Sequence, residues 1–219
     1  MQKSVVFDFD GVIIDSLEVQ RKAFYDSFQL VSDGPLPSFE EFLGHSGDSI
    51  PNIFAKMNLP QSMVEHYRKI ASSNIHLIEI VAGMEDVLRF IQQEGWKCGL
   101  CTGKDRKRTI HILEEFRLID YFDGVVCSDD VTHPKPHPES LLVAIEQLQS
   151  GIDHSVFVGD GKNDLICARE AQVKSIAVAW GHNSVEVLQQ EAPTYFAYSV
   201  DELRQALQTL FQHPRVHYK

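Results

Sequence analysis

The chain alternates short apolar stretches with amphipathic stretches of helical length, and this alternation constrains its fold more than any other feature. From residue 81 onward the pattern predicts strands over 97–102, 124–127, 154–159, 174–179 and 195–197. Helices are predicted beside and between them, over 84–94, 105–115, 138–149, 163–170, 184–190 and 200–210. Strands joined by helical crossovers run parallel, so the pattern predicts a parallel sheet with helices on both faces.

A long helical segment interrupts this alternation directly after the first predicted strand, Val5–Phe7. Residues 16–80 contain helical patterns near 16–30, 38–43, 48–57 and 60–80, and no convincing strand. We interpret 16–80 as an inserted helical cap domain over the carboxyl edge of the sheet. Residues 1–15 and 81–219 then form the core, and the predicted fold class is α/β, a Rossmann-like parallel sheet with a small α-helical cap.

Composition limits the partners that this chain can bind. The 219 residues are 43% hydrophobic, enough for a real core, and carry a net charge of −11. Such a charge argues against nucleic acid or an anionic membrane as a partner, and an anionic substrate would need local cations. Without a basic and apolar leader or an apolar run of about 20 residues, we expect a cytoplasmic protein, either a monomer or a homodimer.

Two of the four cysteines, Cys98 and Cys101, match the spacing C-x-x-C of redox and zinc sites. They lie, however, in the predicted strand 97–102. Residues three apart on a strand point to opposite faces, so this pair is not placed to share a metal or a disulfide. We predict that the cysteines are reduced and structural.

The first predicted strand ends in two acidic residues, Asp8 and Asp10, followed by Gly11. Residues two apart in an extended chain point to the same side, so both carboxyl groups face one small volume. Two like charges there are costly unless a cation lies between them or one group keeps a proton. The alternative is a polar strand end followed by a turn, and the remaining strand ends distinguish the two.

Further polar residues follow three other predicted strands. The strand 97–102 ends in Thr102-Gly103-Lys104, where the glycine leaves its backbone N–H free to approach an anion. The loop after 124–127 holds Lys135 among three prolines. The strand 154–159 is followed by Asp160 and Asp164. Several carboxylates with one lysine and backbone donors predict a site for a hard divalent cation and a phosphate.

In order and spacing, these motifs resemble the four signature motifs of the haloacid dehalogenase-like superfamily. They are Asp8-Phe9-Asp10-Gly11-Val12, Thr102, Lys135-Pro136-His137-Pro138 and Gly159-Asp160-Gly161-Lys162-Asn163-Asp164. The helical insertion resembles the small cap of that superfamily, and the likeness covers nearly the whole chain. Closest in character are its phosphoglycolate phosphatase and β-phosphoglucomutase branches.

The resemblance implies a role for each acidic residue. Asp8 would be the nucleophile that receives the phosphoryl group, and Asp10 the acid and base, kept protonated by the crowding of carboxylates. Mg²⁺ would be held by the Asp8 side chain, the Asp10 main-chain carbonyl and Asp160. Asp164 would orient Lys135 or a metal-bound water.

The resemblance also implies which groups bind the phosphate. Thr102 and Lys135 would hold the non-bridging phosphoryl oxygens, and the backbones of Gly11 and Gly103 would lie against phosphate or substrate. Lys104 opens the densest basic run, Lys104-Asp105-Arg106-Lys107-Arg108. We interpret that run as a solvated helix face, with Lys104 as its member that reaches substrate.

The remaining candidates lie in loops. His45 and Ser46, in a turn between predicted cap helices, are candidates for direct substrate contact, and the alternative is a polar turn. His133 and His137 are interpreted as loop residues, because prolines exclude the helix that would pair them at a metal. For His182, which follows the predicted strand 174–179, the sequence does not distinguish a place at the rim of the site from one in the protein core.

These features together predict a Mg²⁺-dependent phosphatase acting on a small phosphorylated metabolite through an aspartyl-phosphate. The nearest alternative is a phosphomutase of the β-phosphoglucomutase type. A dehalogenase lacks the acid two residues after its nucleophile, so Asp10 argues against that chemistry. A non-catalytic module that binds phosphate or metal remains a further alternative, disfavoured by the insert at 16–80.

Overall fold

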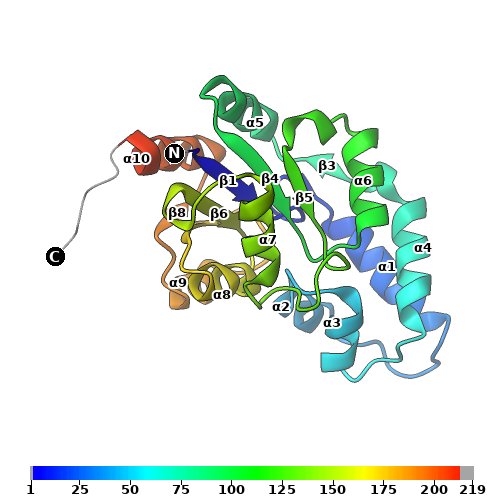
Figure 1. The fold of residues 1–219 in the computed structure, drawn as a ribbon. Coiled ribbons are helices and arrows are strands. Elements are labelled where there is room, and N and C mark those ends of the chain that lie inside the picture. Colours follow the sequence, from blue (N-terminus) through cyan, green and yellow to red (C-terminus); the bar gives the residue numbers. More distant parts are fainter. Residues whose placement is uncertain (1, 213–219) are drawn as a thin grey trace.

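The fold is built on a six-stranded parallel sheet in the order β5-β4-β1-β6-β7-β8 (Figure 1). The computed structural model describes residues 2–212. Its sheet strands are β1 (Ser4–Phe7), β4 (Lys97–Cys101), β5 (Gly124–Val126), β6 (Ser155–Gly159), β7 (Lys174–Val178) and β8 (Tyr195–Ala197). Every neighbouring pair is parallel. In chain order this is the Rossmann arrangement, with its reversal at β1, so the predicted α/β fold is confirmed.

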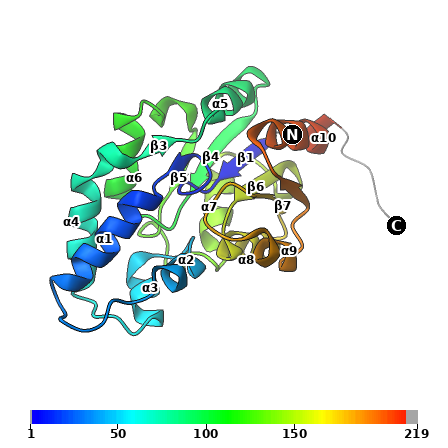
Figure 2. The same cartoon turned by 180° about the vertical axis from the view of Figure 1, so that it is seen from behind.

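Helices cover both faces of the sheet (Figure 2). The core helices are α5 (Met84–Gln93), α6 (Arg106–Glu115), α7 (Glu139–Gln147), α8 (Lys162–Glu170), α9 (Val185–Gln190) and α10 (Val200–Gln212). Successive residues of β1 point to opposite faces: Val5 belongs to the buried cluster that includes Ile91 of α5 and Leu203 of α10, whereas Val6 belongs to a second cluster that includes Leu141 of α7. Short 3₁₀ turns precede two strands, η2 (Ile119–Tyr121) and η3 (Ile152–His154).

The segment 16–80, called here the helical segment, lies to one side of the sheet in both views (Figures 1 and 2). It contains α1 (Leu17–Gln29), α2 (Phe39–Gly44), α3 (Ile50–Lys56), α4 (Met63–Ser73) and the turn η1 (Ile75–Leu77). The prediction of one helix over 60–80 is wrong, since α4 ends at Ser73. The prediction that 16–80 holds no strand is also wrong, because β2 (Ile14–Asp15) pairs antiparallel with β3 (Glu79–Ile80). This pair joins the two ends of the segment.

The helical segment has an aromatic centre. Phe24 of α1 lies 4.8 Å from Phe42 of α2 and 6.2 Å from Phe54 of α3, measured between ring centroids. Tyr67 of α4 meets the Phe54 ring edge-on at 5.8 Å. These rings come from four helices and are all buried, so their packing holds the short helices together.

In the part of the chain that the structure describes, no helix has the length and apolar character needed to cross a membrane. The stretch 213–219, which belongs to the tail that we expect to be weakly ordered, lies outside the described residues.

Candidate active site

Polar side chains meet at the carboxyl ends of three neighbouring strands. Asp8 follows β1, Thr102 follows β4 and Asp160 follows β6, and all three are buried. The backbone N–H of Asp8 donates to the Val158 carbonyl at 2.8 Å, and that of Thr102 to the Val126 carbonyl at 3.0 Å. Strand pairing therefore continues up to the polar residues and positions them. The sheet order reverses at β1, which is where open α/β sheets bind their ligands.

Lys135 reaches the same place from the loop after β5. Its Nζ lies 2.8 Å from Oδ1 of Asp8 and 2.6 Å from Oδ1 of Asp164, and it donates to the Cys101 carbonyl at 3.1 Å. Its side chain is only 1% exposed. Three acceptors use all three donors of the ammonium group, so its position is fully specified.

Burial raises the pKa values of the carboxyl groups around Lys135. Burial, and then the charge of Asp164, raises the pKa of Asp8 to about 7, and burial raises the pKa of Asp160 to about 6. Burial likewise raises the pKa of Asp164. Burial opposes the charge of Lys135, but Asp164 and Asp8 hold the pKa of its ammonium well above the ordinary value. One lysine does not neutralise three buried carboxylates, so the site favours a further cation.

The carboxylates are arranged to accept such a cation. Oxygen atoms of Asp8, Asp160 and Asp164 lie within 4.8 Å of one another. Oδ1 of Asp160 is buried and has no hydrogen-bond partner among the described residues. A buried carboxylate oxygen without a partner is costly, and a metal ion would satisfy it. The donor set is oxygen only, which fits Mg²⁺.

Asp10 differs from the three clustered carboxylates. Its Oδ1 accepts a hydrogen bond from the Ser16 hydroxyl, and its Oδ2 lies 3.0 Å from Nζ of Lys104. Burial acts to raise its pKa, but the ammonium of Lys104 and the Ser16 hydroxyl outweigh burial and lower it. The expectation that crowding keeps a proton on Asp10 is therefore wrong for this arrangement, because a lysine lies beside it.

Two glycines expected to contact phosphate have different neighbours here. Gly11 has φ +77°, and a Cβ there would meet Oδ2 of Asp160 at 2.2 Å. A Cβ on Gly103 would meet the backbone carbonyl oxygens of Asp48 at 2.4 Å and Gly47 at 2.5 Å. Gly11 thus makes room for the carboxylate of Asp160, and Gly103 makes room for the backbone of the helical segment.

The turn that holds His45 and Ser46 contacts the core through its backbone. Nδ2 of Asn163 donates to the carbonyl oxygen of His45 at 3.1 Å and to that of Ser46 at 2.9 Å. Ser46 also lines the central cavity. That cavity measures about 40 Å³ and is lined by Asp8, Asp10, Gln20, Phe42, Ser46, Gly47, Asp48, Ile50, Ile53, Tyr67, Thr102, Gly103, Lys104, Arg108 and His182.

Several lining residues had no functional role in the sequence analysis. Arg108 was assigned to a solvated helix face, but it is buried, so that assignment is wrong for this residue. Tyr67 and Gln20 reach the cavity from α4 and α1. The backbone N–H of His182 donates to Oδ2 of Asp160 at 2.7 Å. Only the density of basic residues around Arg108 gave any signal in the sequence.

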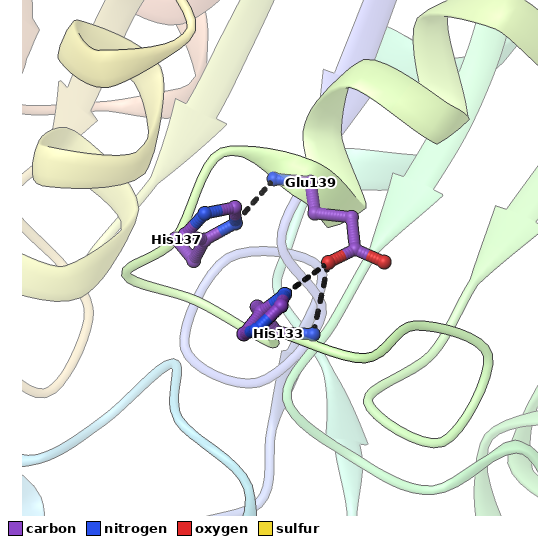
Figure 3. Close-up of side chains that lie close together, drawn as sticks. All are labelled: His133, His137 and Glu139. Atoms are coloured by element: carbon purple, nitrogen blue, oxygen red, sulfur yellow. Dashed lines mark hydrogen bonds and ion pairs between the residues drawn. The ribbon is translucent and has the colours of Figure 1, made fainter.

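His133 and His137 lie in a loop, as predicted, but their rings are only 4.8 Å apart (Figure 3). The lack of a helix therefore does not separate them. The Glu139 carboxylate accepts from the backbone N–H groups of Thr132 and His133, each at 3.0 Å, and lies 2.8 Å from Nδ1 of His133. Because the Glu139 carboxylate already accepts these hydrogen bonds, we interpret the cluster of His133, His137 and Glu139 as one that stabilises the loop carrying Lys135.

All four cysteines are free and buried, as predicted. Burial raises the pKa of Cys101 to about 11 and that of Cys127 to about 12. Buried thiols with raised pKa values are poor nucleophiles, so these residues are structural.

Comparison with known proteins identifies the family. The haloacid dehalogenase-like hydrolase family matches residues 5–178. Pyrophosphatase PpaX of Bacillus pumilus is 31% identical over 91% of this chain and 94% of its own length. The crystal structure of a predicted phosphatase from Clostridium acetobutylicum is 26% identical, with a TM-score of 0.86 over 96% of this chain and 100% of that one. A predicted phosphoglycolate phosphatase from Haemophilus somnus, 17% identical, shares the fold with a TM-score of 0.81 over 94% of this chain and 98% of its own.

This chain belongs to the haloacid dehalogenase-like hydrolase family. It is an enzyme of the phosphatase branch, so the family predicted from the motifs is confirmed. A purely non-catalytic module is thereby set aside.

Proposed function

We propose that this phosphatase hydrolyses a small phosphomonoester in a Mg²⁺-dependent reaction, through an aspartyl-phosphate on Asp8. The observation that carries the proposal is the environment of Asp8. Its carboxylate lies at the switch point of the sheet, 2.8 Å from Nζ of Lys135 and beside Asp160, one buried oxygen of which has no hydrogen-bond partner in the part of the chain that the structure describes. Such a site holds a nucleophile and balances the charge of an incoming phosphate.

The residues of this chain supply both chemical steps. An Asp8 oxygen attacks phosphorus, the bond from phosphorus to the leaving oxygen breaks, and Asp10 gives that oxygen a proton. Water then attacks the phosphorus, Asp10 takes its proton, and the bond from phosphorus to Asp8 breaks, which releases phosphate and restores Asp8. Thr102 holds the non-bridging oxygens in both steps, and Lys135 joins it by exchanging one of its three present acceptors for a phosphoryl oxygen.

Asp8, Asp160 and the main-chain carbonyl of Asp10 would hold the metal. Bound Mg²⁺ would supply charge neutralisation on the phosphoryl oxygens. Asp164, 2.6 Å from Nζ of Lys135, orients that lysine. Lys104 keeps Asp10 charged, which suits the base step. The acid step requires that Lys104 turn to another anion, so that Asp10 can hold a proton.

The helical segment 16–80 would serve as a cap, with 1–15 and the chain from 81 onward as the core. Its backbone lies directly on Gly103 and on the side chain of Asn163, so it would limit the access of bulk water while the site keeps the one water molecule that the second step uses. A phosphomutase of the β-phosphoglucomutase type would use the same nucleophile and remains the second candidate.

The test is a phosphate-release assay with Mg²⁺ over phosphorylated metabolites, including pyrophosphate, the substrate named for the PpaX relatives. Asp8→Asn should lose at least a thousandfold in kcat and keep the wild-type circular dichroism spectrum. Asp33→Asn, an exposed aspartate of the helical segment, is the matched control. Full activity of Asp8→Asn, or of the wild type in excess EDTA, would refute the mechanism. Conversion of β-glucose 1-phosphate to its 6-phosphate without phosphate release would favour the mutase.

A further inference from the structure

Two cationic side chains border the cavity on the side of Asp10 and take part in none of the phosphoryl contacts described above. They are Lys104, whose side chain is 9% exposed, and Arg108, whose side chain is 7% exposed. Lysine and arginine are almost never so deeply buried unless they are paired, because losing water costs a charge several kcal/mol. Asp10 and Asp105 are their partners here, and the donors that these pairs leave over are available to a further anion.

Arg108 is anchored at one end and free at the other. Its Nε donates to Oδ2 of Asp105 at 2.6 Å, and its guanidinium lies 5.5 Å from the centre of the Tyr67 ring. Asp105 also caps α6, so Arg108 is held against the start of its own helix. Hydrogen bonds among the described residues use only its backbone N–H and Nε, which leaves the terminal amino groups available to a ligand.

Lys104 lines the same cavity as Arg108 and lies beside the reacting centre. Its Nζ lies 3.0 Å from Oδ2 of Asp10, the residue proposed to protonate the leaving oxygen. A leaving group within reach of Asp10 therefore lies beside Lys104, and Arg108 lines the same cavity. Thr102, which is proposed to hold the phosphoryl group, lines this cavity too, and its Oγ1 accepts from the backbone N–H of Lys104 at 3.2 Å.

We propose that Lys104 and Arg108 form a subsite for a second anionic group of the substrate, a carboxylate or a second phosphate close to the phosphoryl group. Lys104 and Arg108 already pair with Asp10 and Asp105, but each keeps further N–H donors. An anionic group would accept charge-assisted hydrogen bonds from those donors, whereas a neutral leaving group would form weaker ones. This proposal rests on the proposed phosphatase function and specifies the class of its substrate.

The test compares substrates that carry a second anionic group with one that lacks it. 2-Phosphoglycolate carries a carboxylate where 2-hydroxyethyl phosphate carries a neutral hydroxymethyl group, and the anhydride pyrophosphate carries a second phosphate. For the wild type we expect kcat/KM to be at least tenfold higher for one of the two substrates with a second anionic group than for 2-hydroxyethyl phosphate. Preference for phosphoglycolate alone identifies a carboxylate site, and preference for pyrophosphate alone identifies a phosphate site.

In Arg108→Gln, the ratio of kcat/KM for the preferred substrate to kcat/KM for 2-hydroxyethyl phosphate should fall at least tenfold, mainly through a higher KM for the preferred substrate. Arg108→Lys should restore part of this ratio. Arg106→Gln is the matched control, because Arg106 lies in the same helical turn but pairs with Asp130 at 2.6 Å. If Arg108→Gln does not fold, inhibition of the wild type is decisive: phosphonoacetate should inhibit at least tenfold more tightly than 2-hydroxyethylphosphonate. Equal kcat/KM for all three substrates, or equal inhibition, overturns the subsite and leaves the phosphatase intact. No hydrolysis of any phosphate ester would overturn the proposed function itself.

Discussion

Replacing Gly103 with alanine should separate the docking of the helical segment from the stability of the fold. A Cβ at this position would lie 2.4 Å from the carbonyl oxygen of Asp48 and 2.5 Å from that of Gly47. Both partners are backbone atoms, so no flexible side chain can move aside. The methyl group can be accommodated only if residues 47–48 retreat from the strand ends.

The size of the effect follows from these distances. An ordinary contact of a Cβ begins near 3.4 Å, so the backbone must retreat by roughly 1 Å. A displacement of about 1 Å in an active site costs about 100-fold in rate, or about 2.7 kcal/mol in activation free energy. Gly103 has no positive φ, so alanine is sterically allowed in its backbone conformation. Global stability should therefore change by no more than about 1 kcal/mol.

The assay is steady-state phosphate release, with thermal unfolding measured in parallel. Gly103→Ala should lose about 100-fold in kcat/KM while its Tm stays within about 3 °C of the wild type. Gly44→Ala is the matched control, because no atom lies within 4 Å of its Cβ position, and it should keep wild-type activity. If Gly103→Ala keeps more than a third of the wild-type kcat/KM, the docked arrangement is not the one that catalyses.

Two further predictions concern stability. The pKa values of Asp8 and Asp160 are raised to about 7 and about 6, so the metal-free fold loses stability as pH rises from about 4 to 7. Mg²⁺ should therefore raise Tm more at pH 8 than at pH 5.5. The variant Asp160→Asn should lose most of this increase in Tm. Phe54→Ala empties the aromatic centre of the helical segment and should lower the free energy of unfolding by about 3–5 kcal/mol in urea, whereas Leu36→Ala, 55% exposed, should change it by less than about 0.5 kcal/mol.

The parallel sheet could be predicted because its signals are local. Each buried strand is a short, mostly apolar run, and acidic residues mark the ends of several, such as Asp8 after β1 and Asp160 after β6. The end of α4 could not be predicted in this way. No glycine or proline lies between Pro60 and Gly83, and the helix ends at Ser73 where Asn74 turns its side chain back onto the Ile70 carbonyl at 2.8 Å. The strands β2 and β3 have two residues each, too few for any periodicity.

The motif residues of the candidate site could be predicted because each follows a strand end. The protonation state of Asp10 could not be predicted, because it depends on where the side chain of Lys104 lies. Arg108 was missed for a related reason. A basic residue in the first turn of a helix is usually solvated, and Arg108 is buried only because Tyr67, from the distant α4, packs over it. Such burial is a property of tertiary packing.

The contacts of the helical segment indicate where the choice of substrate is made. The turn between α2 and α3 meets the core through main-chain carbonyls of Leu43, His45 and Ser46, which accept from Asn183 and Asn163. Backbone carbonyls are the same for every side chain, so this docking does not depend on which side chains the turn carries. Side chains that vary the chemistry of the cavity come instead from helices, with Arg108 on α6 and Tyr67 on α4. Because α6 belongs to the core and α4 to the helical segment, Tyr67 packs against Arg108 only when the two are docked. A second anionic group of the substrate that binds Arg108 in this position would therefore favour the docked form, through contacts that an uncharged leaving group does not make.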